Sequence, residues 1–114
     1  MNELDERFDV VLCFGILHRV TDPIRLLRAF ADVLPPGGEI VLETYGSSLP
    51  ADAPAIEIHE PGDVYARDDF VYWGFSAEGL RRLARLVGFD EIEIVDELQV
   101  DGHPRILALL RAPA

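Results

Sequence analysis

A nearly continuous apolar run at residues 8–17, Phe-Asp-Val-Val-Leu-Cys-Phe-Gly-Ile-Leu, limits the possible folds of this chain more than any other part of the sequence. A strand with one solvated face alternates apolar and polar residues, whereas a strand covered on both faces is apolar almost throughout. The run therefore predicts a buried strand of a parallel sheet, covered on both faces.

A helix and a second strand are predicted directly after this run. Asp22 can cap the first free amides of a helix, and Pro23 suits its first position because the missing N–H has no partner there. Prolines and glycines at residues 35–38 end the helix, and residues 39–45 read as a strand. This order predicts a right-handed β-α-β crossover. The apolar stripe of the helix consists of Ile24, Leu27, Phe30, Ala31 and Leu34.

The remaining sequence predicts a long irregular segment, here called the excursion, followed by a helix and a β-hairpin. Residues 46–75 hold glycines, prolines and acids with room for one short strand, and excursions this long tend to be functional or disordered. Ser76 can cap a helix that Gly88 ends. Residues 91–98 alternate, strictly at first, as an edge strand does, whereas residues 106–110 are wholly apolar and belong inside the sheet.

Composition indicates a single small domain over residues 1–114, with 49% hydrophobic residues and no apolar run long enough to cross a membrane. Polar, acidic residues follow Met1, which argues against a secretory leader and favours the cytoplasm. All ten basic residues are arginines, and against 21 acids they leave a net charge of -11. Such a chain is not expected to hold RNA or DNA alone, although a partner could change that.

No metal site is expected. Cys13 is the one cysteine, and its place in the apolar run favours a buried core residue. It has no second thiol for a disulfide or for a metal. The three histidines, His18, His59 and His103, show no ligand spacing with each other or with Cys13.

Two blocks of sequence strongly resemble class I S-adenosylmethionine (SAM) dependent methyltransferases. They are residues 8–23, which include Gly-Ile-Leu-His-Arg-Val and Asp-Pro, and residues 34–44, Leu-Pro-Pro-Gly-Gly-Glu-Ile-Val-Leu-Glu-Thr. The resemblance implies an α/β, Rossmann-like sheet of order 3-2-1-4-5-7-6 with its last strand antiparallel, of which this chain supplies 4-5-7-6. The chain is thus expected to be the C-terminal half of a methyltransferase fold.

Further likeness points to one branch of that superfamily. Glu-Pro-Gly-Asp-Val-Tyr-Ala at residues 60–66, Val71-Tyr72 and Gly-His-Pro-Arg at residues 102–105 are similar to the tRNA wobble-uridine methyltransferases. The best-known branch of that family transfers a carboxymethyl group from carboxy-SAM. The resemblance therefore implies SAM or carboxy-SAM as cofactor and a tRNA or small-molecule acceptor.

The glycine-rich part of the family's cofactor site has no counterpart in the sequence. The Gly-x-Gly-x-Gly turn and the acidic residue that binds the ribose hydroxyls are missing, and Gly37-Gly38 cannot replace the turn because it follows a helix and opens a strand. We therefore expect weak cofactor binding by this chain alone. It could be a truncation or a subunit that pairs with a separate N-terminal half, or it could self-associate as a homodimer through the 8–17 edge.

Cofactor-binding candidates lie at the carboxyl end of the first predicted strand, where ligands bind in open α/β sheets. The resemblance places Phe14, Gly15, Ile16 and Leu17 beside the methionine part of SAM and the acceptor, although Gly15 could serve close packing. His18 is the catalytic candidate, as a base or pocket-lining group, and its alternative is a structural hydrogen bond.

Substrate-binding candidates come from the second strand and the excursion. Glu43, Thr44 and Tyr45 are candidates for a pocket wall, or they merely end the strand. The resemblance places Arg105 near a carboxyl group of the cofactor, and the alternative is a surface ion pair. In the family the excursion covers the active site, where aromatic rings and an arginine can stack a planar substrate and pair an anion, or simply pack the loop. These excursion residues are Tyr65, Arg67, Tyr72 and Trp73.

The leading hypothesis is a fragment or subunit of a methyltransferase that transfers a methyl or carboxymethyl group to an unidentified acceptor. Such an enzyme acts mainly by aligning the two reactants and excluding water. The competing hypothesis is a non-catalytic interaction module that retains half of the fold.

Overall fold

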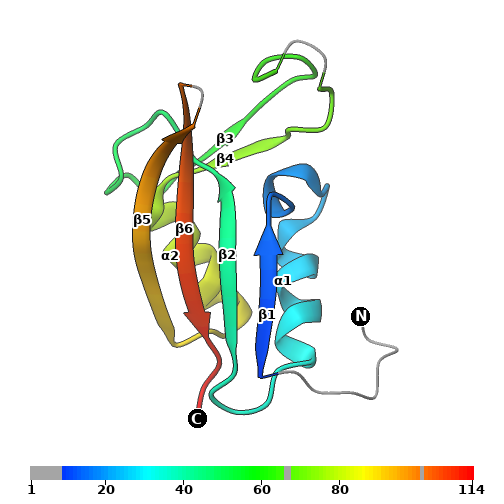
Figure 1. Ribbon diagram of the computed structural model, residues 1–114, viewed down its shortest axis with the longest axis vertical. Coiled ribbons are helices and arrows are strands. Elements are labelled where there is room, and N and C mark those ends of the chain that lie inside the picture. Colours follow the sequence, from blue (N-terminus) through cyan, green and yellow to red (C-terminus); the bar gives the residue numbers. More distant parts are fainter. Residues whose placement is uncertain (1–8, 66–67, 101) are drawn as a thin grey trace.

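A four-stranded mixed sheet with two helices on one face forms the centre of the computed structural model (Figure 1). Its strands, in spatial order, are β1 (Val10–Phe14), β2 (Glu39–Tyr45), β6 (His103–Arg111) and β5 (Glu91–Val100). The structure describes residues 9–65, 68–100 and 102–114.

Strand pairing confirms the predicted topology. β1 pairs parallel with β2, and β6 pairs antiparallel with both β2 and β5. The apolar β6 therefore lies inside the sheet and the alternating β5 lies at its edge, as predicted from their patterns. A register shift between Ile94 and Asp96 coincides with the point where the alternation of β5 becomes irregular.

Both helices begin where their sequences predict and the second also ends there, whereas the first ends at Asp32, before Leu34 and the predicted stop at residues 35–38. α1 (Pro23–Asp32) starts at Asp22, whose side chain accepts a hydrogen bond from the Arg25 N–H at 2.9 Å. α2 (Ala77–Val87) ends at Gly88, whose φ of 115° lies in the left-handed region that glycine tolerates. Neither helix in the described ranges is long and apolar enough to cross a membrane.

The core lies between these helices and one face of the sheet. Side chains that alternate along the strands point to this face, so each strand contributes every second residue. The fully buried members include Cys13, Leu27, Ile40, Leu42, Leu80, Ala84, Ala108 and Leu110.

The other face of β1 differs from the prediction of a strand covered on both faces. Val10, Leu12 and Phe14 are 51%, 64% and 51% exposed. Both helices in the described residues lie on the opposite face (Figure 1), so only Val11 and Cys13 of this strand meet the core. The strand is also shorter than the apolar run, which continues through a turn into the 3-10 helix η1 (Leu17–Arg19).

The excursion at residues 46–75 contains two short strands where one was expected. β3 (Ile56–Ile58) and β4 (Trp73–Phe75) pair antiparallel and project beyond one end of the main sheet (Figure 1). Ser47 N–H donates to the Phe75 carbonyl at 2.8 Å, which ties this small sheet to the end of β2. The excursion is therefore positioned over the carboxyl ends of β1 and β2.

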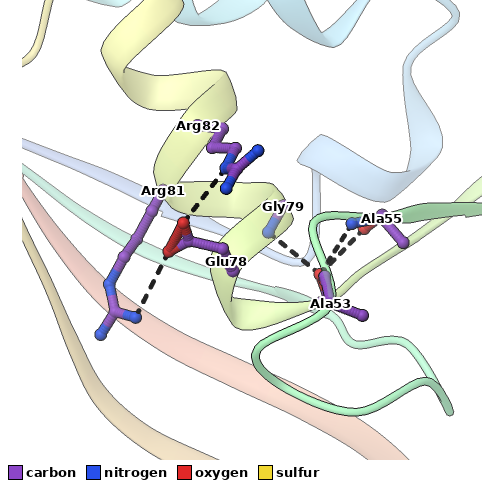
Figure 2. A network of polar contacts seen from close by, with 7 residues as sticks. Ala53, Ala55, Glu78, Gly79, Arg81 and Arg82 are labelled. Atoms are coloured by element: carbon purple, nitrogen blue, oxygen red, sulfur yellow. Dashed lines mark hydrogen bonds and ion pairs between the residues drawn. The ribbon is translucent and has the colours of Figure 1, made fainter.

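Ser76 joins the excursion to the start of α2, at the junction where Figure 2 shows Ala53 and Ala55 beside Gly79. Its hydroxyl accepts from the Gly79 N–H at 3.0 Å and from the Ala55 N–H at 3.1 Å, and it donates to the Ala53 carbonyl. Gly79 packs so closely here that an added Cβ would lie 2.3 Å from the Ala55 carbonyl oxygen. In the same first turn of α2, Glu78 forms ion pairs with Arg81 and Arg82.

We predict that Gly79→Ala destabilises the chain by at least about 1 kcal/mol, although alanine favours a helix more than glycine does. The new methyl group must displace the Ala55 backbone and with it the contacts of Ser76. The midpoint of urea unfolding, followed by circular dichroism, measures the effect. Arg85→Ala at an exposed position of α2 is the control, and a Gly79→Ala midpoint at or above the control value would contradict the packing argument.

We also predict that the chain self-associates through β1. Among the described residues β1 pairs only with β2, and its open face carries exposed apolar side chains, a combination that favours association with another copy. Leu12→Lys should weaken the dimer, whereas Leu86→Lys, at a position that is 65% exposed on α2, should not. Sedimentation equilibrium at tens of micromolar decides it, and a monomeric parent chain would refute the prediction.

Candidate functional site

The carboxyl ends of β1 and β2 meet at a turn centred on Gly15. Its N–H donates to the Glu43 carbonyl at 2.9 Å, and its φ of 68° lies in the left-handed region. A Cβ at this position would lie 3.8 Å from the Arg105 Nη2 atom. The glycine therefore lets the chain leave β1 abruptly, close to the charged groups at the start of β6.

Glu43 and Arg105 form an ion pair beside this turn. The Arg105 Nη2 and Nε atoms lie 2.6 and 2.8 Å from Glu43 Oε1, and their side chains are only 14% and 27% exposed. The structure thus shows the ion pair that was the alternative for Arg105, but places it at the edge where a ligand is expected. A guanidinium has five N–H donors, so contacts to one carboxylate oxygen do not exhaust it.

His18 lies on the helix side of the sheet and is completely buried. Its Nδ1 atom accepts a hydrogen bond from the Tyr45 N–H at 3.1 Å and lies 3.0 Å from Thr44 Oγ1. Burial, reinforced by the positive charges of Arg105 and Arg19, lowers the pKa of His18 to about 4. The imidazole is therefore neutral at physiological pH.

Strand alternation separates the candidates into two groups. Thr44 is buried on the helix side with His18, whereas Glu43 and Tyr45 lie on the open side with Arg105, their neighbour across the strands. On β1, Phe14 also lies on the open side. The sequence-predicted residues thus share one end of the sheet but not one surface.

Four aromatic or imidazole rings gather on the open side, and two of them were not predicted. Tyr45 Oη lies 3.3 Å from His103 Nδ1, and its ring meets His59 edge-on with 5.6 Å between centroids. Tyr65 packs on His103 at 4.7 Å. Burial is the main cause that raises the pKa of Tyr45. The Gly-His-Pro-Arg run at residues 102–105, which ends at Arg105, could have drawn attention to His103, but nothing in the sequence marks His59.

Tyr72 and Trp73 fasten the excursion to η1. The Tyr72 N–H donates to the His18 carbonyl at 2.8 Å, and the Trp73 indole N–H donates to the Val20 carbonyl at 2.7 Å. Arg19 and Asp68 add an ion pair at 2.6 Å. The bond of Tyr72 is made by its backbone, and substrate binding by the Tyr72 and Trp73 side chains stays a prediction.

The other predicted residues fall in different settings. Ile16 is 43% exposed at the turn, next to the exposed Phe14, whereas Leu17 is fully buried in the core and offers no side-chain surface to a ligand. Arg67 lies outside the described residues.

The strand order and the β1-α1-β2 crossover define a Rossmann-like methyltransferase sheet. Residues 1–94 match the family described as methyltransferase domain, and the chain belongs to that family. The N-terminal domain of EvdMO1, solved with SAH and D-fucose, is similar in structure with a TM-score of 0.62 and 29% identity over 96% of this chain and 51% of that domain. A SAM-dependent methyltransferase of Thermotoga maritima shares the fold, with a TM-score of 0.68 at 19% identity over 96% of this chain and 60% of its own.

Within the family, the chain is similar to tRNA U34 carboxymethyltransferases. It is 35% identical over 92 residues to that of Chromohalobacter salexigens and 38% identical over 92 residues to that of Vibrio atlanticus. These alignments cover 81% of this chain but only 26% and 27% of the relatives, so the chain spans about a quarter of their length. The predicted resemblance to the wobble-uridine branch is confirmed.

We predict that the buried His18 makes folding stability depend on pH. An unfolded histidine takes up a proton below about pH 6.5, whereas folded His18, with its pKa of about 4, does not. Stability conferred by the neutral ring is therefore complete above about pH 6.5 and falls, by up to about 3 kcal/mol, as the pH is lowered toward 4.

Urea unfolding at several pH values between 7 and 4 measures this dependence. His18→Asn, whose amide oxygen can still accept from the Tyr45 N–H, should flatten the profile in this window. His103→Asn is the matched control, because it removes the histidine that contacts the Tyr45 hydroxyl instead. Identical slopes for the parent chain and His18→Asn would show that His18 is protonated in the folded state.

Proposed function

We propose that this chain forms the acceptor side of a SAM-dependent methyltransferase that modifies the wobble uridine of tRNA. The observation that carries the proposal is the convergence of Gly15, Glu43, Tyr45 and Arg105 at one edge of the sheet, in a chain whose relatives are tRNA U34 carboxymethyltransferases. A tRNA acceptor would place the reaction in the cytoplasm. No observation favours the non-catalytic interaction module.

The residues present fit one part of a SAM site. Gly15 has no side chain to fill the turn, and the neighbouring Phe14 and Ile16 expose apolar surface there, so this edge can receive the methionine part of the cofactor. The nucleoside-binding glycine turn has no counterpart in the 114 residues. When bound, SAM would supply an electrophilic methyl group, or a carboxymethyl group in carboxy-SAM, on a sulfonium centre.

The side chains on the open face would align the acceptor. Tyr65 and His103 present a pair of half-buried rings on which a planar base can stack, and the Glu43–Arg105 ion pair fixes a guanidinium beside them. The excursion, tied to η1 and to the end of β2, would exclude water from the reacting groups. Alignment and water exclusion are the main contributions that an enzyme makes to a direct displacement.

The choice between SAM and carboxy-SAM depends in this proposal on Arg105. A guanidinium can bind the additional carboxylate of carboxy-SAM through two parallel N–H groups. Glu43 already occupies Nε and Nη2, so a second carboxylate must bind the remaining N–H groups or displace Glu43. We keep both cofactors in the proposal.

A chimaera tests the function. The whole 114-residue chain would replace the corresponding segment of the C. salexigens enzyme, and mass spectrometry of tRNA would report modification of its wobble uridine. We expect the chimaera to modify tRNA, and Arg105→Gln within it to reduce turnover by about 100-fold, in the range of losing one charged, oriented contact to the reacting groups.

Arg111→Gln is the matched control, because Arg111 also forms ion pairs from β6, with Glu39 and Glu91, but at the opposite end of the sheet. A chimaera that keeps the parent's circular dichroism spectrum and binds SAM yet leaves tRNA unmodified would refute the proposed acceptor.

A further inference from the structure

The Glu43 carboxylate holds the guanidinium of Arg105 along one edge only. Nε and Nη2 lie 2.8 and 2.6 Å from the same oxygen, Oε1 of Glu43. A guanidinium has five N–H donors, and this side-on contact uses two of them. The other three are on Nη1 and Nη2, whose outer N–H groups form an edge that matches the two oxygens of a carboxylate.

A second arginine on the same strands shows how such an edge is filled in a purely structural contact. Arg111 of β6 also meets one oxygen of Glu39 on β2 side-on, with Nε at 3.0 Å and Nη2 at 2.5 Å. Its Nη1 then lies 2.6 Å from Glu91 on β5. Two acids of the protein therefore bind both edges of this guanidinium.

Arg105 has a different neighbour on β5. The residue that pairs with Arg105 across the strands is Leu98, whereas Glu91 pairs with Arg111. Among the described residues, Glu43 is the one acid within ion-pair distance of Arg105. The Arg105 side chain is also only 14% exposed, against 44% for Arg111, so water replaces a second acid less readily there. The Nη1–Nη2 edge of Arg105 thus keeps a capacity to bind an anion.

The Nη2 end of this guanidinium lies at the turn that leaves β1. A Cβ added to Gly15 would be 3.8 Å from Nη2, and the Gly15 N–H donates to the Glu43 carbonyl at 2.9 Å. Glu43 therefore holds the turn through its backbone and Arg105 through its side chain. Ordering a long side chain on binding costs free energy, so an arginine that is held in advance binds a ligand more tightly.

We propose that Glu43 is the positioning residue of a carboxylate site on Arg105. It pins Nε and Nη2, so that the Nη1–Nη2 edge is presented beside the Gly15 turn. The inference rests on the proposed function, because the bound carboxylate is taken to belong to the cofactor, either in its methionine part or in the carboxymethyl group of carboxy-SAM. Glu43 acts through Arg105 and does not contact the ligand.

The charge and the acceptor oxygen of Glu43 have opposite effects on such a ligand. The negative charge repels a second carboxylate, whereas the oxygen keeps the guanidinium in place. Glu43→Gln removes the charge but retains an oxygen that can accept from Nε and Nη2. Glu43→Leu removes both in a side chain of similar size. The difference between these two uncharged variants therefore isolates the positioning effect.

The test titrates the 15N-labelled 114-residue chain with acetate at constant ionic strength, and with acetamide as the uncharged probe. Acetate should shift the Arg105 Nε–H signal and the Gly15 amide along one saturation curve, and acetamide should shift neither. Glu43→Gln should bind acetate at least as tightly as the parent chain. Glu43→Leu should bind it about tenfold more weakly than Glu43→Gln, which corresponds to the cost of ordering one long side chain.

Glu39→Gln and Glu39→Leu are the matched controls, because they make the same changes beside Arg111 at the opposite end of the sheet. Both should leave the acetate titration at Gly15 unchanged. Circular dichroism spectra establish that each variant keeps the fold of the parent chain. Should Glu43→Leu not fold, Glu43→Met replaces it, since methionine also lacks an oxygen that can accept a hydrogen bond.

Calorimetric titration of the chimaera with both cofactors distinguishes the two sources of the carboxylate. If Glu43→Leu weakens binding of carboxy-SAM but not of SAM relative to Glu43→Gln, the site takes the carboxymethyl group. If it weakens both equally, the site takes the carboxylate of the methionine part. Unchanged affinities for both cofactors would overturn the inference.

Three results with acetate would also overturn it and leave the proposed function standing. They are equal affinities of Glu43→Gln and Glu43→Leu, shifts that acetamide reproduces, and no acetate-induced shift of the Arg105 Nε–H signal in the parent chain. Conversely, a chimaera that leaves tRNA unmodified while the acetate titrations behave as expected would overturn the proposed function alone.

Discussion

Burial of one face of the sheet under α1 and α2 is the interaction on which the rest of the structure depends. The buried side chains of β1, β2 and β6 form one continuous core with those of the two helices. Burying each large apolar side chain contributes about 1.5 to 3 kcal/mol, so this face dominates the stability of a chain of 114 residues. Because strand side chains alternate, covering one face also decides which residues point away from the helices.

That alternation divides the edge at the carboxyl ends of β1 and β2 into two chemical environments. On the helix side, the His18 ring is desolvated, neutral and bound to the end of β2. On the open side, Glu43 and Arg105 form a partly exposed ion pair next to the Tyr45 and His103 rings. The expectation that His18 could be a base assumed an accessible imidazole, whereas a buried ring with an occupied Nδ1 suits a donor better.

Local patterns predicted much of this fold from the sequence, and long-range contacts account for what they missed. The strand at residues 39–45, the caps at Asp22 and Ser76 and the helix end at Gly88 depend on neighbours a few residues away. The exposed side of β1 could not be predicted, because Val-Val-Leu-Cys-Phe is apolar toward both faces. The Glu43–Arg105 pair and the contact of His59 with Tyr45 join distant segments, and no local pattern encodes them.

Charge pairing bears on how a tRNA could be held. In the described part of the chain, ion pairs with Asp or Glu engage Arg19, Arg81, Arg82, Arg105 and Arg111. Each paired guanidinium has much of its charge compensated, and the net charge of the whole chain is -11. Phosphate contacts supply most of the non-specific affinity for nucleic acids, so this surface opposes binding of the tRNA backbone. In the proposed enzyme, this chain would therefore contribute contacts to a single base at the sheet edge more readily than contacts to the tRNA phosphates.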